Sequence, residues 1–135
     1  MGNRTVLPEG WNRPKGYSNA VIAQGRQIYV AGQVGWDSEE RLNSDDIAEQ
    51  AAQALRNVVA VLKTAGAGPE HIVRMTWYVT DKAAYIAGLK EIGQAYREII
   101  GRNFPAMTAV EVTALVEDRA KVEVECTAVV AEGSG

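Results

Sequence analysis

The chain has 135 residues, of which 47% are hydrophobic, so we expect one compact domain over residues 1–135 with a small core. Its 14 basic and 17 acidic residues give a formal charge of −3, and no basic run is interleaved with aromatic residues. Nucleic acid is therefore not an expected partner. The single cysteine excludes an internal disulfide, and no apolar run approaches the roughly 20 residues of a membrane span. We recognise no targeting leader, and we expect a cytoplasmic protein with no membrane partner.

The first elements along the chain are two short clusters of apolar, β-branched and aromatic residues, at positions 20–23 and 27–31, which are typical of β-strands. A helix follows. Ser44 is its expected N-cap, and the two aspartates after it favour the positive end of the helix. Apolar residues then recur at helical spacing until Gly66: Ile47, Ala51, Leu55, Val58, Val59 and Leu62.

A strand at positions 72–79 separates this helix from a second one. The second helix should begin near Asp81 and end before Gly101. Gly88 and Gly93 weaken it intrinsically, so we expect close packing against another element as the reason that they are tolerated. Its apolar face is formed by Tyr85, Ile86, Leu89, Ile92, Tyr96 and Ile99.

Two more strands are expected at positions 108–112 and 121–130. In the last strand Val122, Val124 and Cys126 alternate strictly with polar residues, so one face packs and the other meets polar surroundings. The predicted order is β-β-α-β-α-β-β, an α+β fold with two helices on one face of a mostly antiparallel sheet. The opposite face has no cover within the chain, so we expect a second subunit to provide it.

Two segments resemble the signature of the Rid (YjgF/YER057c/UK114) family, also called the endoribonuclease L-PSP family. They are Asn103 to Val112 and Lys121-Val122-Glu123-Val124-Glu125. The resemblance covers nearly the whole chain. It implies a chorismate-mutase-like fold assembled as a homotrimer with sites in the clefts between subunits. It also implies a cofactor-free deaminase or hydrolase of a reactive imine, enamine or related small metabolite. Further landmarks occur in family order: Gly16-Tyr17, Ala31-Gly32-Gln33, Ala65-Gly66, Asp81 and Phe104-Pro105-Ala106.

Met107 is the clearest departure from the family's imine-deaminating members, in which an arginine follows the Pro-Ala pair. A guanidinium is a bidentate donor suited to a substrate carboxylate, whereas a thioether is apolar. The resemblance also implies a changed polar contact, since Lys90 replaces a frequent asparagine, and Ala109 replaces a frequent cysteine. These differences together indicate an altered ligand.

By the same resemblance, Glu123 matches the glutamate that positions the attacking water, and Tyr17, Gly32 and Thr108 fall in the cleft. Trp36 is a candidate from its own position: a large apolar ring in an expected loop is either an interface anchor or a cleft wall, and we favour the wall. Without the resemblance, a glutamate on the polar face of a strand is most often a surface residue. Met107 and Tyr17 would likewise be ordinary packing residues.

Other chemistries receive little support from the sequence. The only histidine, His71, has no second histidine or cysteine at ligand spacing, so no metal is expected. Cys126 alternates with core valines and is interpreted as a small hydrophobe. No nucleophile elbow or glycine-rich phosphate loop is present, and no cofactor is expected. Two hypotheses remain: the Rid-like enzyme, which we favour, and a non-catalytic trimeric protein that binds a small molecule or has a regulatory role.

Overall fold

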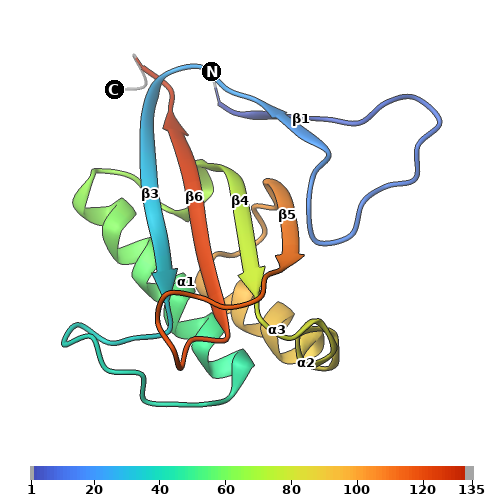
Figure 1. Ribbon diagram of the computed structural model, residues 1–135. Helices are drawn as coiled ribbons and strands as arrows, with labels where there is room; N and C mark the ends of the chain where they lie inside the picture. Colours follow the sequence, from blue (N-terminus) through green and yellow to red (C-terminus); the bar gives the residue numbers. More distant parts are fainter. Residues whose placement is uncertain (1, 133–135) are drawn as a thin grey trace.

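The structure is a computed structural model that describes residues 2–132. A four-stranded sheet has the strand order β3-β6-β4-β5, in which β4 and β5 run parallel and the other neighbours run antiparallel. The helices α1 and α3 cover one face of this sheet (Figure 1). The elements are β1 (Arg4–Val6), β2 (Ala20–Ile22), β3 (Arg26–Val34), α1 (Ile47–Thr64), η1 (Pro69–His71), β4 (Ile72–Val79), α2 (Lys82–Ala87), α3 (Leu89–Ile99), β5 (Ala106–Glu111) and β6 (Val122–Val130). The expected α+β fold is confirmed.

The start of α1 differs from the prediction by two residues. Asp46, and not Ser44, is the N-cap: its backbone is extended, and its carboxylate accepts a hydrogen bond from the Glu49 amide at 3.0 Å. The Ser44 hydroxyl instead accepts the amide of Asp46 at 3.0 Å. A carboxylate at the N-cap satisfies a free amide and also carries the negative charge that this end of a helix favours.

The predicted second helix is divided at Gly88 into α2 and α3. A Cβ added to Gly88 would lie 3.3 Å from the Ala84 carbonyl oxygen and 3.4 Å from the Ile47 side chain of α1, so close packing favours glycine here. Gly93 is different, because the atom nearest to its added Cβ is a guanidinium nitrogen of Arg97, at 3.5 Å. The expected packing therefore applies to Gly88 but not to Gly93. The structure also contains β1, which the sequence did not predict and which pairs only with β2.

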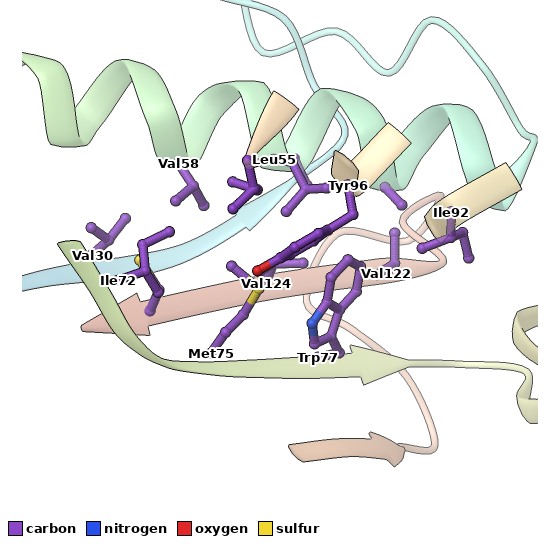
Figure 2. Close-up of a cluster of buried hydrophobic side chains, with 14 of the residues drawn as sticks. Val30, Leu55, Val58, Ile72, Met75, Trp77, Ile92, Tyr96, Val122 and Val124 are labelled. Atoms are coloured by element: carbon purple, nitrogen blue, oxygen red, sulfur yellow. The ribbon is translucent and has the colours of Figure 1, made fainter. Parts of the chain in front are cut away.

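The hydrophobic core lies between the helices and the sheet (Figure 2). Its fully buried members include Leu55 of α1, Met75 of β4 and Val124 of β6. Burying each such side chain contributes about 1.5–3 kcal/mol to folding. Ile92 and Tyr96 bring α3 onto the same core, so both helices are held against one face of the sheet.

The opposite face of the sheet, which we call the open face, carries no helix (Figure 1). Its side chains meet across the strands in register, and Tyr29 is 73% exposed. The Tyr78 hydroxyl donates a hydrogen bond to Glu125. Residues of the open face include Tyr29, Thr76, Tyr78, Glu123, Glu125 and Thr127.

No helix within residues 2–132 is long and apolar enough to cross a membrane.

Gln50 of α1 is a buried polar residue that ties two loops to the helix layer. Its side-chain amide donates hydrogen bonds to the Ser44 carbonyl at 2.9 Å and to the Arg119 carbonyl at 3.2 Å. Its side-chain oxygen accepts the Lys121 amide at 2.8 Å. Because every polar group of this side chain is paired, the loops before α1 and before β6 have fixed positions.

Candidate functional site

An apolar cavity of about 420 Å³ opens between α2, α3 and the helix-side face of β4 and β5. We call it the aromatic pocket. Its volume is within the range of about 300–1,000 Å³ that is usual for small-molecule sites. Five aromatic side chains line it: Tyr17, Trp77, Tyr85, Tyr96 and Phe104.

Contacts among these rings fix the walls of the pocket. Tyr96 and Phe104 stack with ring centroids 5.6 Å apart, and Trp77 and Tyr85 are tilted with centroids 6.4 Å apart. The Tyr96 hydroxyl donates to the Asn103 carbonyl at 2.5 Å. Burial raises the pKa of the Tyr96 and Tyr85 hydroxyls, so both stay neutral at physiological pH.

The turn that leads into β5 is held from both sides. The Asn103 side-chain amide donates to the Pro69 carbonyl at 2.8 Å and to the Ile72 carbonyl at 3.0 Å. Ser18 joins the N-terminal segment to the same turn, since its amide donates to the Pro105 carbonyl at 2.9 Å and its hydroxyl to the Phe104 carbonyl at 2.5 Å. These bonds place Tyr17, the neighbour of Ser18, at the pocket.

The structure brings three of the predicted site residues together in the aromatic pocket: Tyr17, Met107 and Ala109. Met107 and Ala109 pair across the sheet with Met75 and Trp77, which point into the core, so they face the helix side. The intervening Thr108 therefore points to the open face. The position at which the family arginine is expected thus opens into an apolar cavity.

Glu123 and Gly32 lie together on the open face, away from the pocket. A Cβ added to Gly32 would stand 1.9 Å from the Oε2 atom of Glu123, so a larger residue here would displace this carboxylate from its position. Glu123 pairs with Tyr78, which pairs with Val110 of β5. Glu123 is therefore two strand spacings, about 10 Å, from β5 and on the other face of the sheet from Met107.

The remaining two candidates lie elsewhere. Trp36 packs against Val34, Leu42 and Ala120 in a small second cluster below the sheet, and its carbonyl accepts the side-chain amide of Asn57 at 2.9 Å. Lys90 is exposed on α3 and does not line the aromatic pocket. Within one chain, neither residue meets Met107 or Glu123.

Several residues of the pocket were not recognised as site residues from the sequence. Tyr85, Ile92 and Tyr96 belong to the predicted apolar face of a helix, and Trp77 lies in the strand predicted at positions 72–79. Helical spacing does not tell a packed face from a face that borders a cavity. Arg97 carried one usable signal, since it follows Gly93 by one helical turn and lies on the same helix face.

Residues 2–132 contain no side-chain arrangement suited to metal binding or to thiol chemistry. No cluster of three or more histidine, cysteine, aspartate or glutamate side chains is close enough to hold a metal ion there. Cys126 is buried in the core, and burial raises its thiol pKa to about 12. It is therefore a packing residue, as expected.

Comparison with known proteins decides the family. Residues 11–130 match the family model described as Endoribonuclease L-PSP. The chain belongs to this family, the Rid or YjgF/YER057c/UK114 family. Human 2-iminobutanoate/2-iminopropanoate deaminase is 36% identical over 114 residues, which are 84% of this chain and 79% of the human protein.

Solved structures of the Rid family share the fold. The Rid-family protein YyfB of Yersinia pestis superposes with a TM-score of 0.86 at 33% identity, over 96% of this chain and 100% of its own. A YjgF/YER057c/UK114 protein of Mycobacterium tuberculosis has a TM-score of 0.64 at 38% identity, over 85% of this chain and 87% of its own. The resemblance seen in the sequence motifs is thereby confirmed for the family and the fold.

Proposed function

We propose that this Rid-family protein is a cofactor-free deaminase or hydrolase of a small imine, enamine or related metabolite. Relatives named as 2-iminobutanoate/2-iminopropanoate deaminases at 34–36% identity support this class of reaction. Water adds to the carbon of the C=N bond, a C=O bond replaces it, and nitrogen leaves as ammonia with both protons of the water. Such a reaction needs a bound substrate, a positioned water and a group that relays protons.

The observation that carries the proposal is the position of Met107 in an apolar pocket beside Tyr17 and Ala109. Without a guanidinium at this position, short 2-imino acids lose the expected anchor for their carboxylate. An apolar wall instead favours a larger carbon skeleton. We therefore assign the protein a specificity different from that of the arginine-containing members of the family.

The site is proposed to form between subunits of a homotrimer. Met107 and Glu123 lie on opposite faces of the sheet in one chain, so a single chain does not bring them to one substrate. The uncovered open face, with Gly32 and Glu123, is the surface that would cover the pocket of a neighbouring copy. Glu123 is proposed to orient the attacking water there.

The substrate argument is tested by restoring the arginine. Wild-type protein should act very slowly on 2-iminopropanoate generated in situ, and Met107→Arg should raise ammonia release about ten- to a hundredfold, the effect of one charge-assisted bidentate contact. Efficient turnover of this imine by the wild type would show that the arginine is dispensable in this protein.

The catalytic role is tested at Glu123, with Glu125 as its control. Both carboxylates lie on the open face of β6, two residues apart. Glu123→Gln should lower kcat far more than it weakens ligand binding, because it removes a base that acts mainly in the transition state. Glu125→Gln should be milder. Equal, small effects would favour the alternative, a non-catalytic trimeric protein that binds a small molecule in the pocket.

The assembly is tested by sedimentation equilibrium. A homotrimer should bury an interface of roughly standard size on the open face. A monomer that persists at micromolar concentration would remove the intersubunit site and with it the proposed role of Glu123.

A further inference from the structure

We propose that Arg97 is the carboxylate-binding residue of the aromatic pocket, and that the pocket takes a small carboxylate with an aromatic or branched apolar body. In family members with an arginine at the position of Met107, the anion is bound from β5. Here Arg97 would bind it from α3. That this ligand is an imine rests on the proposed function, whereas its binding in the pocket does not.

The first support is the geometry at Gly93. Arg97 and Gly93 both line the pocket, and they lie one turn apart on α3. The Nη1 atom of Arg97 is 3.5 Å from the place that a Cβ of Gly93 would occupy. The guanidinium therefore lies back along the helix, over the glycine, at the rim of the cavity. A Cβ at this position would be in ordinary van der Waals contact with the guanidinium, so Gly93 and Arg97 are direct neighbours on the pocket side of α3.

The second support is the charge around the pocket. Lys15 also lines the pocket, and none of the residues lining the cavity within the described chain is acidic. The ion pairs found among residues 2–132 use Arg41 and Arg119, and neither Arg97 nor Lys15 takes part in them. Within one chain, these two cations at an apolar cavity have no acidic partner and are suited to an anionic group. The planar fork of arginine matches a carboxylate.

The third support is the division of the pocket into a polar rim and an apolar interior. The Tyr96 hydroxyl is already bonded to the Asn103 carbonyl, so it is committed within the protein. Trp77 and Phe104 present ring surfaces, and Met107 a thioether, to the interior. Such a pocket fits a ligand with two ends, a ring inside and a carboxylate at Arg97.

Binding is tested by isothermal titration calorimetry of the full chain with 3-phenylpropanoate, a stable compound with both ends. It should bind once per subunit. Neutral 3-phenylpropanamide, which lacks the charge, and propanoate, which lacks the ring, should each bind at least about tenfold more weakly. Equal affinity for the amide, or no binding of 3-phenylpropanoate, would overturn the proposal.

Variants locate the anchor. Arg97→Gln should weaken 3-phenylpropanoate binding by about ten- to a hundredfold, and Arg97→Lys should retain part of the affinity because it keeps charge but not the fork. Arg102→Gln removes the same charge from an exposed residue outside the pocket and should have no effect. Gly93→Leu should block binding although leucine is the better helix former. Unchanged binding in Arg97→Gln would place the anion elsewhere and refute the assignment.

Ammonia release separates this proposal from the proposed function. If 3-phenylpropanoate binds through Arg97 but the imine of phenylpyruvate yields no ammonia above the uncatalysed rate, the pocket assignment stands and the enzyme proposal fails. If imines are hydrolysed and Arg97→Gln changes neither their KM nor the binding of 3-phenylpropanoate, the enzyme proposal stands and the pocket assignment fails.

Discussion

The two faces of the sheet use neighbouring residues of the same strand for different purposes. On β6, Val122 and Val124 are fully buried against the helices, whereas Glu123 and Glu125 lie half-buried on the open face. On the helix side the polar groups are paired within the chain, as at Gln50. The open face carries two carboxylates and a tyrosine that is 73% exposed.

Residues that stabilise the fold and residues available for assembly and chemistry therefore alternate along the same strand. Because side chains alternate along a strand, a change at one position acts on the core and a change at the next acts on the open face. Substitutions behind the sheet should therefore reduce the free energy of unfolding, and substitutions on the open face should leave it nearly unchanged.

The largest effect is expected for Leu55→Ala. Leu55 is fully buried between α1 and the sheet, and its truncation should lower the free energy of unfolding by about 3–4 kcal/mol through lost burial and a cavity. Urea unfolding followed by circular dichroism measures it. The matched change Tyr29→Ala on the open face should cost about 0.5 kcal/mol or less in the monomer. A similar cost for both would mean that the open face also carries folding energy.

The next effect is expected for Gln50→Leu, which keeps the volume but leaves the Ser44 and Arg119 carbonyls and the Lys121 amide without their partner. Unfolding free energy should fall by about 2–3 kcal/mol, since buried groups lose their hydrogen bonds. Gln53→Leu is the control, because among the described residues the Gln53 side chain is hydrogen-bonded to the Asn57 side chain of the same helix. A neutral Gln50→Leu would show that water replaces the lost bonds.

The elements of the fold that carry a strong local pattern were predicted from the sequence. The strand predicted at positions 72–79 is β4, with the same bounds. It could be predicted because β-branched and aromatic residues follow directly on the short helical turn at Pro69–His71. The alternation in β6 also predicted which residues are buried. By contrast, β1 has three residues, too few for a period, and exists only through its pairing with β2.

The aromatic pocket could not be predicted in the same way, because its walls come from segments far apart in the sequence. Tyr17, Trp77 and Phe104 meet only once Ser18 and Asn103 have fixed the turn before β5. Family motifs placed Met107 and Glu123 in one site, but motifs do not state on which face of the sheet a side chain lies. That information came from the strand register.

A smaller effect, confined to assembly, is expected for Tyr29→Arg. Tyr29 is the most exposed aromatic residue of the open face, so a charge there should leave urea unfolding of the monomer nearly unchanged. If the open face is the subunit interface, the dissociation constant of the trimer should rise by about tenfold or more. Sedimentation velocity at several concentrations measures this. Unchanged assembly would place the interface on another surface.

The smallest effect is expected for Glu125→Gln. It is measured through the thiol of Cys126, the next residue of β6, which lies on the other face of the sheet. Burial is the main cause that raises the pKa of the Cys126 thiol to about 12, and the charge of Glu125 adds to it. Removing that charge should lower the thiol pKa only slightly. The thiol should therefore stay protonated and unreactive toward a disulfide reagent at pH 8, and unfolding free energy should change by about 0.5 kcal/mol or less.

The same thiol distinguishes the two faces when the labelling rates of the variants are compared. Cys126 reacts only when the core opens, so its labelling rate follows the population of open states. Leu55→Ala, at a cost of about 3 kcal/mol, should speed labelling roughly a hundredfold, because each 1.4 kcal/mol is a factor of about ten. Glu125→Gln and Tyr29→Ala should leave the rate within about twofold of wild type. Fast labelling of Glu125→Gln at unchanged stability would show that charge on the open face, more than burial, protects the thiol.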